Sequence, residues 1–449
     1  MNGISFGKIT FGRLAFTIVL SLTGCVTQAS AETISFGTAS AKAIQKSYDL
    51  ILGAIDSGIA KNKVREAKVA YKPTLNTSVN TEYVAGIGPQ GSTQNQQAVV
   101  VGNTILPGNT RFQNAISLNG NYTINDFGNR ANTLKAAKFH ALSSDIQLKI
   151  AARDLKLDVL DAYIQALLTY KQAKSLEQQL ALQSQLYEMK TKLWHAGKIS
   201  RIDLGEQAIA LKNTETELQA MRQTLGDNLN KLSSFTQEPY YVPSVIMEDL
   251  DCEPAVKFER FVPAATPDFQ AYGLLIKEKQ AEMRAINAQR YPQLVAFTNF
   301  VLYGSNKNEY FTGWSNIRAR AGYFGIGMQL PVYDGGKTKV ALDGKKLEIA
   351  RLVAERDKKL WGLRSDYQKA ATAANLYGVE LDTKAELVST SKDQLGMVVR
   401  LTASQVMEKT KAISEQIELA KHQLNEDSTR MKHLAAAKRL MIYSEIASK

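Results

Sequence analysis

The chain has 449 residues, 44% of them hydrophobic and 22% charged, which argues against a disordered chain. Its two cysteines exclude a disulfide-rich scaffold and a cysteine-based zinc framework, and the spacing of its four histidines argues against a metal site. The formal net charge of +12 indicates a basic surface, which alone does not imply a nucleic-acid partner.

The first 24 residues predict an export signal that ends before Cys25. Lys8 and Arg13 precede a short apolar run, residues 14–20, which is too short to cross a bilayer as a stable helix. Two cleavage sites compete. The sequence Leu-Thr-Gly before Cys25 resembles a bacterial lipobox and favours lipidation of this cysteine. The alternative is ordinary signal-peptidase cleavage after Ala31, at Ala-Ser-Ala.

All ten prolines lie in two windows, 73–107 and 239–331. Proline removes a backbone donor and clashes inside a helix, so the proline-free stretches 108–238 and 332–449 are compatible with very long helices. An ordinary α/β enzyme, whose loops distribute proline more evenly, is disfavoured.

The two halves of the sequence resemble each other. Residues 125–128 match residues 333–336, and the same offset of 208 aligns apolar positions for more than a hundred residues. The sequence Pro-x-Leu at Pro73 matches that at Pro292 with an offset of 219. We therefore predict two copies of one unit. Their bounds are 32–236 for the first repeat, 237–267 for a linker, and 268–449 for the second repeat.

Each repeat begins with a helix, predicted over 60–70 and 268–290, that ends before proline. A β-hairpin follows, over about 74–125 and about 293–333. Its strands alternate apolar with small or polar residues and are nearly free of charge. This pattern favours one face in lipid and one toward a lumen over a water-exposed sheet on a core. Four strands cannot close a barrel, so several chains must contribute.

Long helices complete each repeat, over about 127–236 and about 335–446. A break is predicted at 195–200, and two interleaved apolar stripes over 146–167 indicate neighbours on both sides. A plain antiparallel coiled coil without a channel is the alternative. Aspartates that cap the helices and glycines that permit the turn define the strand-to-helix junctions: Asp126, Gly128, Asp334, Gly335 and Gly336.

These features, duplicated over about residues 40–449, resemble the TolC-type outer-membrane efflux proteins. The strongest motif is Leu-Pro-Val-Tyr-Asp-Gly-Gly ending at Gly336, and the next is Gly-Lys-Ile-Ser-Arg-Ile-Asp ending at Asp203. The resemblance implies a mostly α fold with membrane β structure. Four strands per chain would form a trimeric 12-stranded β-barrel, continuous with a long periplasmic α-helical barrel. It places the chain in the bacterial outer membrane, with a periplasmic adaptor and an inner-membrane transporter as partners.

The second helical tip departs from the family, because Gln405 and Lys411 stand where Gly and Asp are common. Gate residues therefore cannot be transferred directly. The candidates at the periplasmic tips are Gly197, Asp203, Glu206, Arg400, Glu408 and Lys411. The chain carries no nucleophile motif, phosphate loop or cofactor motif, so we expect a passive exit duct and no enzyme. The alternative is a structural or adhesive coiled-coil envelope lipoprotein. Drug-like molecules and secreted polypeptides remain equally open as cargo.

Overall fold

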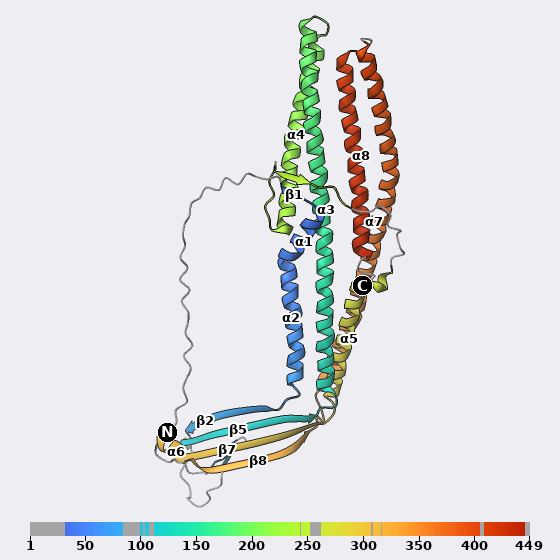
Figure 1. Ribbon diagram of the computed structural model, residues 1–449. Helices are drawn as coiled ribbons and strands as arrows, with labels where there is room; N and C mark the ends of the chain where they lie inside the picture. The colour runs from blue at the N-terminus through green and yellow to red at the C-terminus, as the bar shows by residue number, and fades with distance from the viewer. Residues whose placement is uncertain are drawn as a thin grey trace, which may run out of the picture.

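The computed structural model describes residues 32–83, 99–101, 104–106, 112–242, 244–251, 262–306, 309–315, 317–404 and 408–444. Long helices run side by side, and a four-stranded sheet lies across one end of them (Figure 1). Within these residues, no helix is long and apolar enough to cross a membrane. Cys25 and the hairpin tip 86–97 lie outside the described residues.

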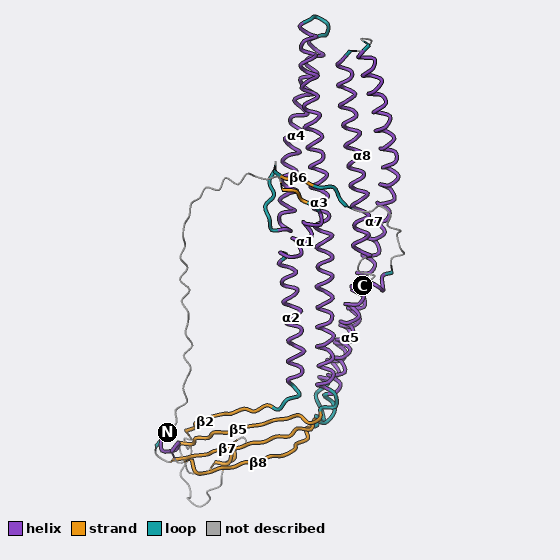
Figure 2. The backbone as a smooth tube through the Cα atoms, in the orientation of Figure 1, coloured by secondary structure: helices purple, strands orange, loops and turns teal. Residues whose placement is uncertain are grey.

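The helices are α1 (Phe36–Lys46), α2 (Tyr48–Val69), α3 (Asn129–His195), α4 (Arg201–Thr236), α5 (Pro267–Ala288), α6 (Tyr310–Ser315), α7 (Lys337–Ala403) and α8 (Lys409–Ser444), with a 3₁₀ turn η1 (Pro263–Ala265). The strands are β1 (Glu32–Ile34), β2 (Thr74–Tyr83), β3 (Val99–Val101), β4 (Thr104–Leu106), β5 (Phe112–Asn125), β6 (Val245–Met247), β7 (Gln293–Asn306) and β8 (Ile317–Gln329). Figure 2 shows how strands and helices separate along the molecule.

The internal repeat predicted from the sequence appears in the helix bounds. Helices α3 and α7 each have 67 residues, and α7 starts and ends 208 positions after α3. Helices α4 and α8 each have 36 residues and share that offset. Helices α2 and α5 each have 22 residues and are offset by 219. The break predicted at 195–200 separates α3 from α4.

The sheet has the order β2-β5-β7-β8, with every neighbouring pair antiparallel. Its register places Val79 beside Ile116 and Ile116 beside Leu302, on one apolar face. On the other face, the register aligns Asn76, Asn119 and Asn299. The alternation in the sequence thus gives one apolar face and a second face that is largely polar along β2 and β5, whereas β7 places Val295, Phe297, Val301 and Tyr303 on this second face. Strands β2 and β8 are the two edges of the sheet.

The helices form a wall one helix thick. Near the sheet, packed neighbours follow the order α2, α3, α5, α7, and farther away the order α4, α3, α8, α7. Helix α2 lies below α4, and α5 lies below α8 (Figure 1). Helix α3 therefore has neighbours on both sides throughout, as its two apolar stripes predict. The edges of the wall are α2 and α4 on one side and α7 on the other.

A belt of short elements packs against the wall at mid-height. Strand β1 pairs in parallel with β6, and α1 packs on α3 and α4. The largest buried cluster of the described residues forms here, and it includes Ile34, Ala39, Tyr163 and Leu229. Residues 32–34, predicted as the start of the first repeat, pair with β6 of the predicted linker, whereas α1 packs on helices of the first repeat. The small elements α6, β3 and β4 in the hairpin tips were not predicted.

Candidate functional site

The first strand-to-helix junction ties three elements together. Phe127 and Gly128 adopt positive φ values of 50° and 93°, which turn the chain from β5 into α3. The Asp126 carboxylate accepts from the backbone N–H groups of Gly128 (3.3 Å) and Arg130 (2.8 Å). Arg130 also donates to this carboxylate, donates to the Ala70 carbonyl after α2, and lies over the Tyr71 ring. The N-cap position is Gly128, but the aspartate supplies the acceptor.

The second junction repeats this geometry with a smaller network. Gly335 and Gly336 have φ values of 64° and 82°. The Asp334 carboxylate accepts from the N–H groups of Gly336 (2.9 Å) and Thr338 (3.0 Å) and from the Thr338 hydroxyl. These hydrogen bonds, the hydroxyl first, hold the pKa of the Asp334 carboxyl below its usual range. Both junctions thus satisfy the first N–H groups of a long helix with an aspartate that precedes the cap.

The first tip, between α3 and α4, consists of a glycine that ends α3 and a capping box that begins α4. Gly197 has φ 70° and ends α3, with its N–H donating to the Trp194 carbonyl at 2.9 Å. Ser200 and Asp203 form a capping box, in which each side chain accepts from the backbone N–H of the other at 3.1 Å. The Asp203 carboxylate is therefore occupied by the cap, whereas Glu206 is exposed and belongs to no such cap.

The second tip carries its charges on both sides of residues 405–407, which lie outside the described residues. Arg400 is exposed in the last turn of α7. Glu408 directly precedes α8 and accepts from the Thr410 hydroxyl at 3.1 Å. Lys411 pairs with Glu415 at 2.7 Å. Within the described part of the chain, no ion pair joins these candidates to Asp203 or Glu206.

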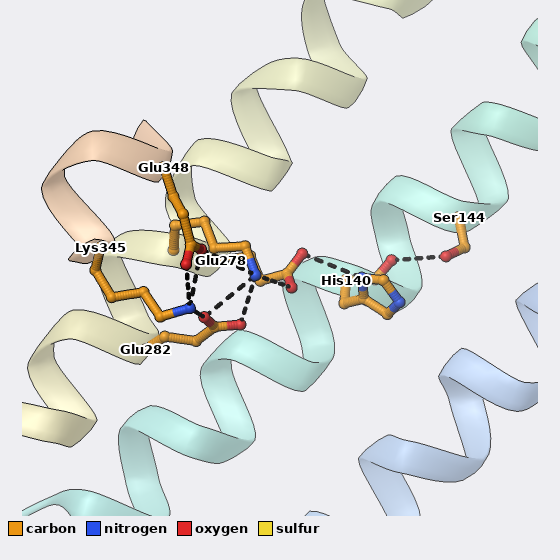
Figure 3. Close-up of polar contacts among 7 residues, drawn as sticks. His140, Ser144, Glu278, Glu282, Lys345 and Glu348 are labelled. Atoms are coloured by element: carbon orange, nitrogen blue, oxygen red, sulfur yellow. Dashed lines mark hydrogen bonds and ion pairs between the residues drawn. The ribbon is translucent and has the colours of Figure 1, made fainter. Parts of the chain in front are cut away.

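A charged cluster connects the two repeats across a groove near the sheet (Figure 3). His140 on α3 lies 3.1 Å from Glu278 on α5, and Lys345 on α7 pairs with Glu282 and Glu348, both at 2.9 Å. Burial opposes ionisation, but hydrogen bonds from Lys345 and Lys279 lower the pKa of the Glu282 carboxyl. The groove, about 810 Å³, is lined by α2, α3 and α5 with Lys345.

A buried ion pair fixes α3 to the start of α5. Arg153 donates to both carboxylate oxygens of Asp268, at 2.5 and 3.3 Å, and both side chains are almost fully buried. Sequence reasoning missed this pair because its partners are 115 positions apart and no local pattern announces it. It also missed the capping role of Ser200, although the spacing Ser-x-x-Asp is a readable capping signal.

Both edges of the molecule expose large apolar side chains. On α2 they include Ile51, Leu52, Ile55 and Ile59, and on α7 they include Val340, Leu347, Trp361 and Val379. On the edge strands they include Leu75, Val79 and Tyr83 of β2 and Phe324, Ile326 and Met328 of β8. Exposed apolar stripes of this extent are typical of interaction surfaces. Within the described residues, no group of three or more His, Cys, Asp or Glu side chains is arranged to hold a metal ion.

Comparison with solved structures identifies the fold. The chain superposes on the outer membrane protein VceC of Vibrio cholerae with a TM-score of 0.68 and 15% identity, covering 90% of this chain and 96% of that one. It matches the CmeC outer membrane channel of Campylobacter jejuni with a TM-score of 0.72 and 12% identity, covering 92% and 85%. A membrane protein of Pseudomonas aeruginosa gives 0.71 and 17%, covering 97% and 96%. At these identities the likeness concerns the fold alone.

Sequence comparison supplies the family. A search of curated proteins found no match. A family model described as outer membrane efflux protein matches residues 39–236, the first repeat with most of its belt segment. The second repeat carries helices of the same lengths at a constant offset, and the fold of the whole chain is that of outer-membrane channels. Residues 39–236 therefore match the outer membrane efflux protein family, and the whole chain has the fold of solved outer-membrane channels.

Proposed function

We propose that three copies of this chain form the exit duct of a tripartite export system in the outer membrane. Each copy contributes four strands to one 12-stranded barrel and one helical wall to a periplasmic tunnel. A periplasmic adaptor and an inner-membrane transporter deliver the substrate. The family model that matches the first repeat describes an outer membrane efflux protein, and the work of a duct requires no catalytic residue.

The main support for this proposal is that the two edge strands of the sheet have no partner on their outer sides in the described chain. Strands β2 and β8 each have only one neighbour in the four-stranded sheet, which leaves a row of backbone groups unpaired on either side. Backbone groups cannot stay unpaired in lipid, so the β8 edge of one copy must meet the β2 edge of the next. Helix α2 leads into β2 and β8 leads into α7, so the helical edges meet on the same sides.

The number of copies follows from the width of the barrel. Two copies would supply eight strands, and a barrel of about eight strands is filled by its own side chains. Three copies are the smallest closed ring that leaves room for water along the axis. The apolar face of the sheet then contacts lipid, and the face with Asn76, Asn119 and Asn299 lines the lumen.

The entrance is proposed at the two helical tips, the ends of the wall farthest from the sheet (Figure 1). One copy keeps the charges of its two tips apart, so a closed entrance requires neighbouring copies to bring them together. Glu206 and Arg400 are exposed and suited to such contacts, whereas Lys411 already pairs with Glu415 on its own helix. Asp203 is held in its cap and is the weaker candidate.

The test is the mass and conductance of the mature protein purified in detergent. Light scattering is expected to give three chains per particle, and the particle is expected to conduct ions in a planar bilayer. Heat-dissociated chains serve as the control and are expected not to conduct. A monomeric, water-soluble rod would overturn the proposal in favour of a coiled-coil envelope protein without a channel.

A further inference from the structure

The first residue of the belt directly follows one of the two predicted leader-cleavage sites. Strand β1 starts at Glu32, the residue that follows Ala29-Ser30-Ala31. We propose that the leader is cleaved after Ala31, so that Cys25 leaves with it and the mature chain is not lipid-anchored. This inference rests on the proposed function in one respect, namely that the sheet is the part of the chain inside the outer membrane.

The position of β1 is fixed by contacts on several sides. Its last residue, Ile34, is 2% exposed and belongs to the main buried cluster. The Ile34 carbonyl accepts from the Tyr163 hydroxyl at 2.9 Å and from the Glu248 N–H at 3.0 Å. Lys42 and Lys46 of the adjoining α1 pair with Glu238 after α4. Strand β1 and helix α1 are therefore an integral part of the belt.

The length of helix α3 gives the distance from Ile34, which contacts Tyr163, to the sheet. Tyr163 lies 34 positions after Asn129, the first residue of α3 and the neighbour of the β5 junction. The helix is uninterrupted, and a rise of about 1.5 Å per residue separates the two by about 50 Å. The last turns of α2 beside this junction expose Lys63, Arg65 and Lys68. Such charges exclude the hydrocarbon layer from the helical side of the junction.

A lipid on Cys25 cannot cover this distance. Nine positions separate Cys25 from Ile34, and a fully extended chain spans at most about 3.5 Å per residue, or about 32 Å in total. This limit holds however residues 25–31 are arranged. Roughly 20 Å remain between the farthest reach of the cysteine and the membrane side of the junction.

Lipidation would therefore require β1 to leave the belt. Detachment would expose the buried Ile34 side chain and break the two hydrogen bonds that its carbonyl accepts, from the Tyr163 hydroxyl and from the Glu248 N–H. Cleavage after Ala31 creates no such conflict, because the new N-terminus is already in place as the first residue of β1.

The experiment expresses the full chain in a Gram-negative host and measures the intact mass of the purified mature protein. The expected mass is that of an unmodified chain beginning at Glu32. Cys25→Ser is expected to leave this mass and the yield unchanged, whereas Ala31→Leu is expected to accumulate the uncleaved precursor. An acylated chain beginning at Cys25, or precursor accumulation in Cys25→Ser, would overturn the inference. These masses are read whether or not the protein conducts, so failure of the duct proposal remains distinguishable.

Discussion

At the first tip, the Asp203 carboxylate accepts from both the hydroxyl and the N–H of Ser200. These hydrogen bonds, the hydroxyl first, lower the pKa of Asp203. We predict that Ser200→Ala and Asp203→Ala both increase amide hydrogen exchange in the first turn of α4, because each removes half of the capping box. Hydrogen-exchange mass spectrometry of the detergent-solubilised protein measures this, with Glu206→Gln as the control that leaves exchange unchanged.

The cap also has a defined pH dependence. A carboxyl whose folded pKa is depressed stabilises the folded state fully above its unfolded pKa, about 3.9 for Asp. The contribution is lost as the pH falls through the lower folded value. Protection of the first turn of α4 is therefore expected to remain constant from pH 7 to about pH 5 and to fall only below about pH 4. A loss of protection near pH 6 would contradict this assignment.

The buried pair of Arg153 and Asp268 gives a second prediction at this scale. Removal of Arg153 leaves Asp268 as an uncompensated buried charge, which typically costs about 3–5 kcal/mol. Removal of Asp268 costs less than this, because Arg153 keeps its ion pair with Asp154 at 2.7 Å. Arg153→Met and Asp268→Leu are each expected to lower the thermal unfolding temperature markedly. The double variant is expected to lose clearly less than the sum of both, and calorimetry of all four proteins checks this. Additive losses would show that the two side chains stabilise the fold independently.

Among the elements, the strand-to-helix junctions depend most on residue identity. Gly128 and Gly336 have φ values of 93° and 82°, which cost an L-residue about 1–2 kcal/mol. An added Cβ at either position meets nothing closer than 3.5 Å, so the backbone alone sets the cost. We predict that Gly128→Ala and Gly336→Ala each destabilise the protein by this amount in thermal unfolding.

Gly273 provides the matched control for the junction glycines. It lies inside α5, and an added Cβ would meet no atom within 4 Å. Alanine has a higher helix propensity than glycine by about 1 kcal/mol, so Gly273→Ala is expected to stabilise the same protein. Equal destabilisation by all three substitutions would show that the junction conformation is not the cause.

The sequence predicted the long elements well because each of them carries a repeated signal. The offset of 208 transfers the bounds of α3 to α7, and the absence of proline permits helices of 67 residues. The helix predicted at 60–70 in fact starts at Tyr48. The alternation along the strands predicts which face is apolar, and the observed register agrees for β2 and β5, whereas β7 carries apolar side chains on both faces.

The belt and the tip charges could not be predicted, for a different reason. Strand β1 has three residues, and its partner β6 follows more than 200 positions later. No local period marks a pairing that depends on the shape of the finished wall. The gate candidates were chosen by their place near the helix ends, but the use of Asp203 in a cap follows from hydrogen-bond geometry.

In the proposed ring, each edge of the chain forms half of an interface, and the two halves must lie at the same height along the wall. Leu347 lies ten positions after the start of α7, and Ile59 lies ten positions before the end of α2. Helix α2 ends and helix α7 starts beside the sheet. Leu347 and Ile59, which are 72% and 51% exposed, therefore lie at the same level on opposite edges of the wall. In a closed ring they lie at the contact between neighbouring copies.

We predict that Ile59→Glu and Leu347→Glu each weaken the trimer without unfolding the chain. Each substitution removes an apolar contact of about 1.5–3 kcal/mol and places a charge at the contact, and the ring repeats it three times. Leu142→Glu is the matched control, because Leu142 is similarly exposed at 52% but lies on α3, in the middle of the wall. The temperature of trimer dissociation, followed by native electrophoresis, is expected to fall for the two edge variants alone. Equal sensitivity of Leu142→Glu would place the contact between copies elsewhere, and unchanged edge variants would show that these edges do not meet.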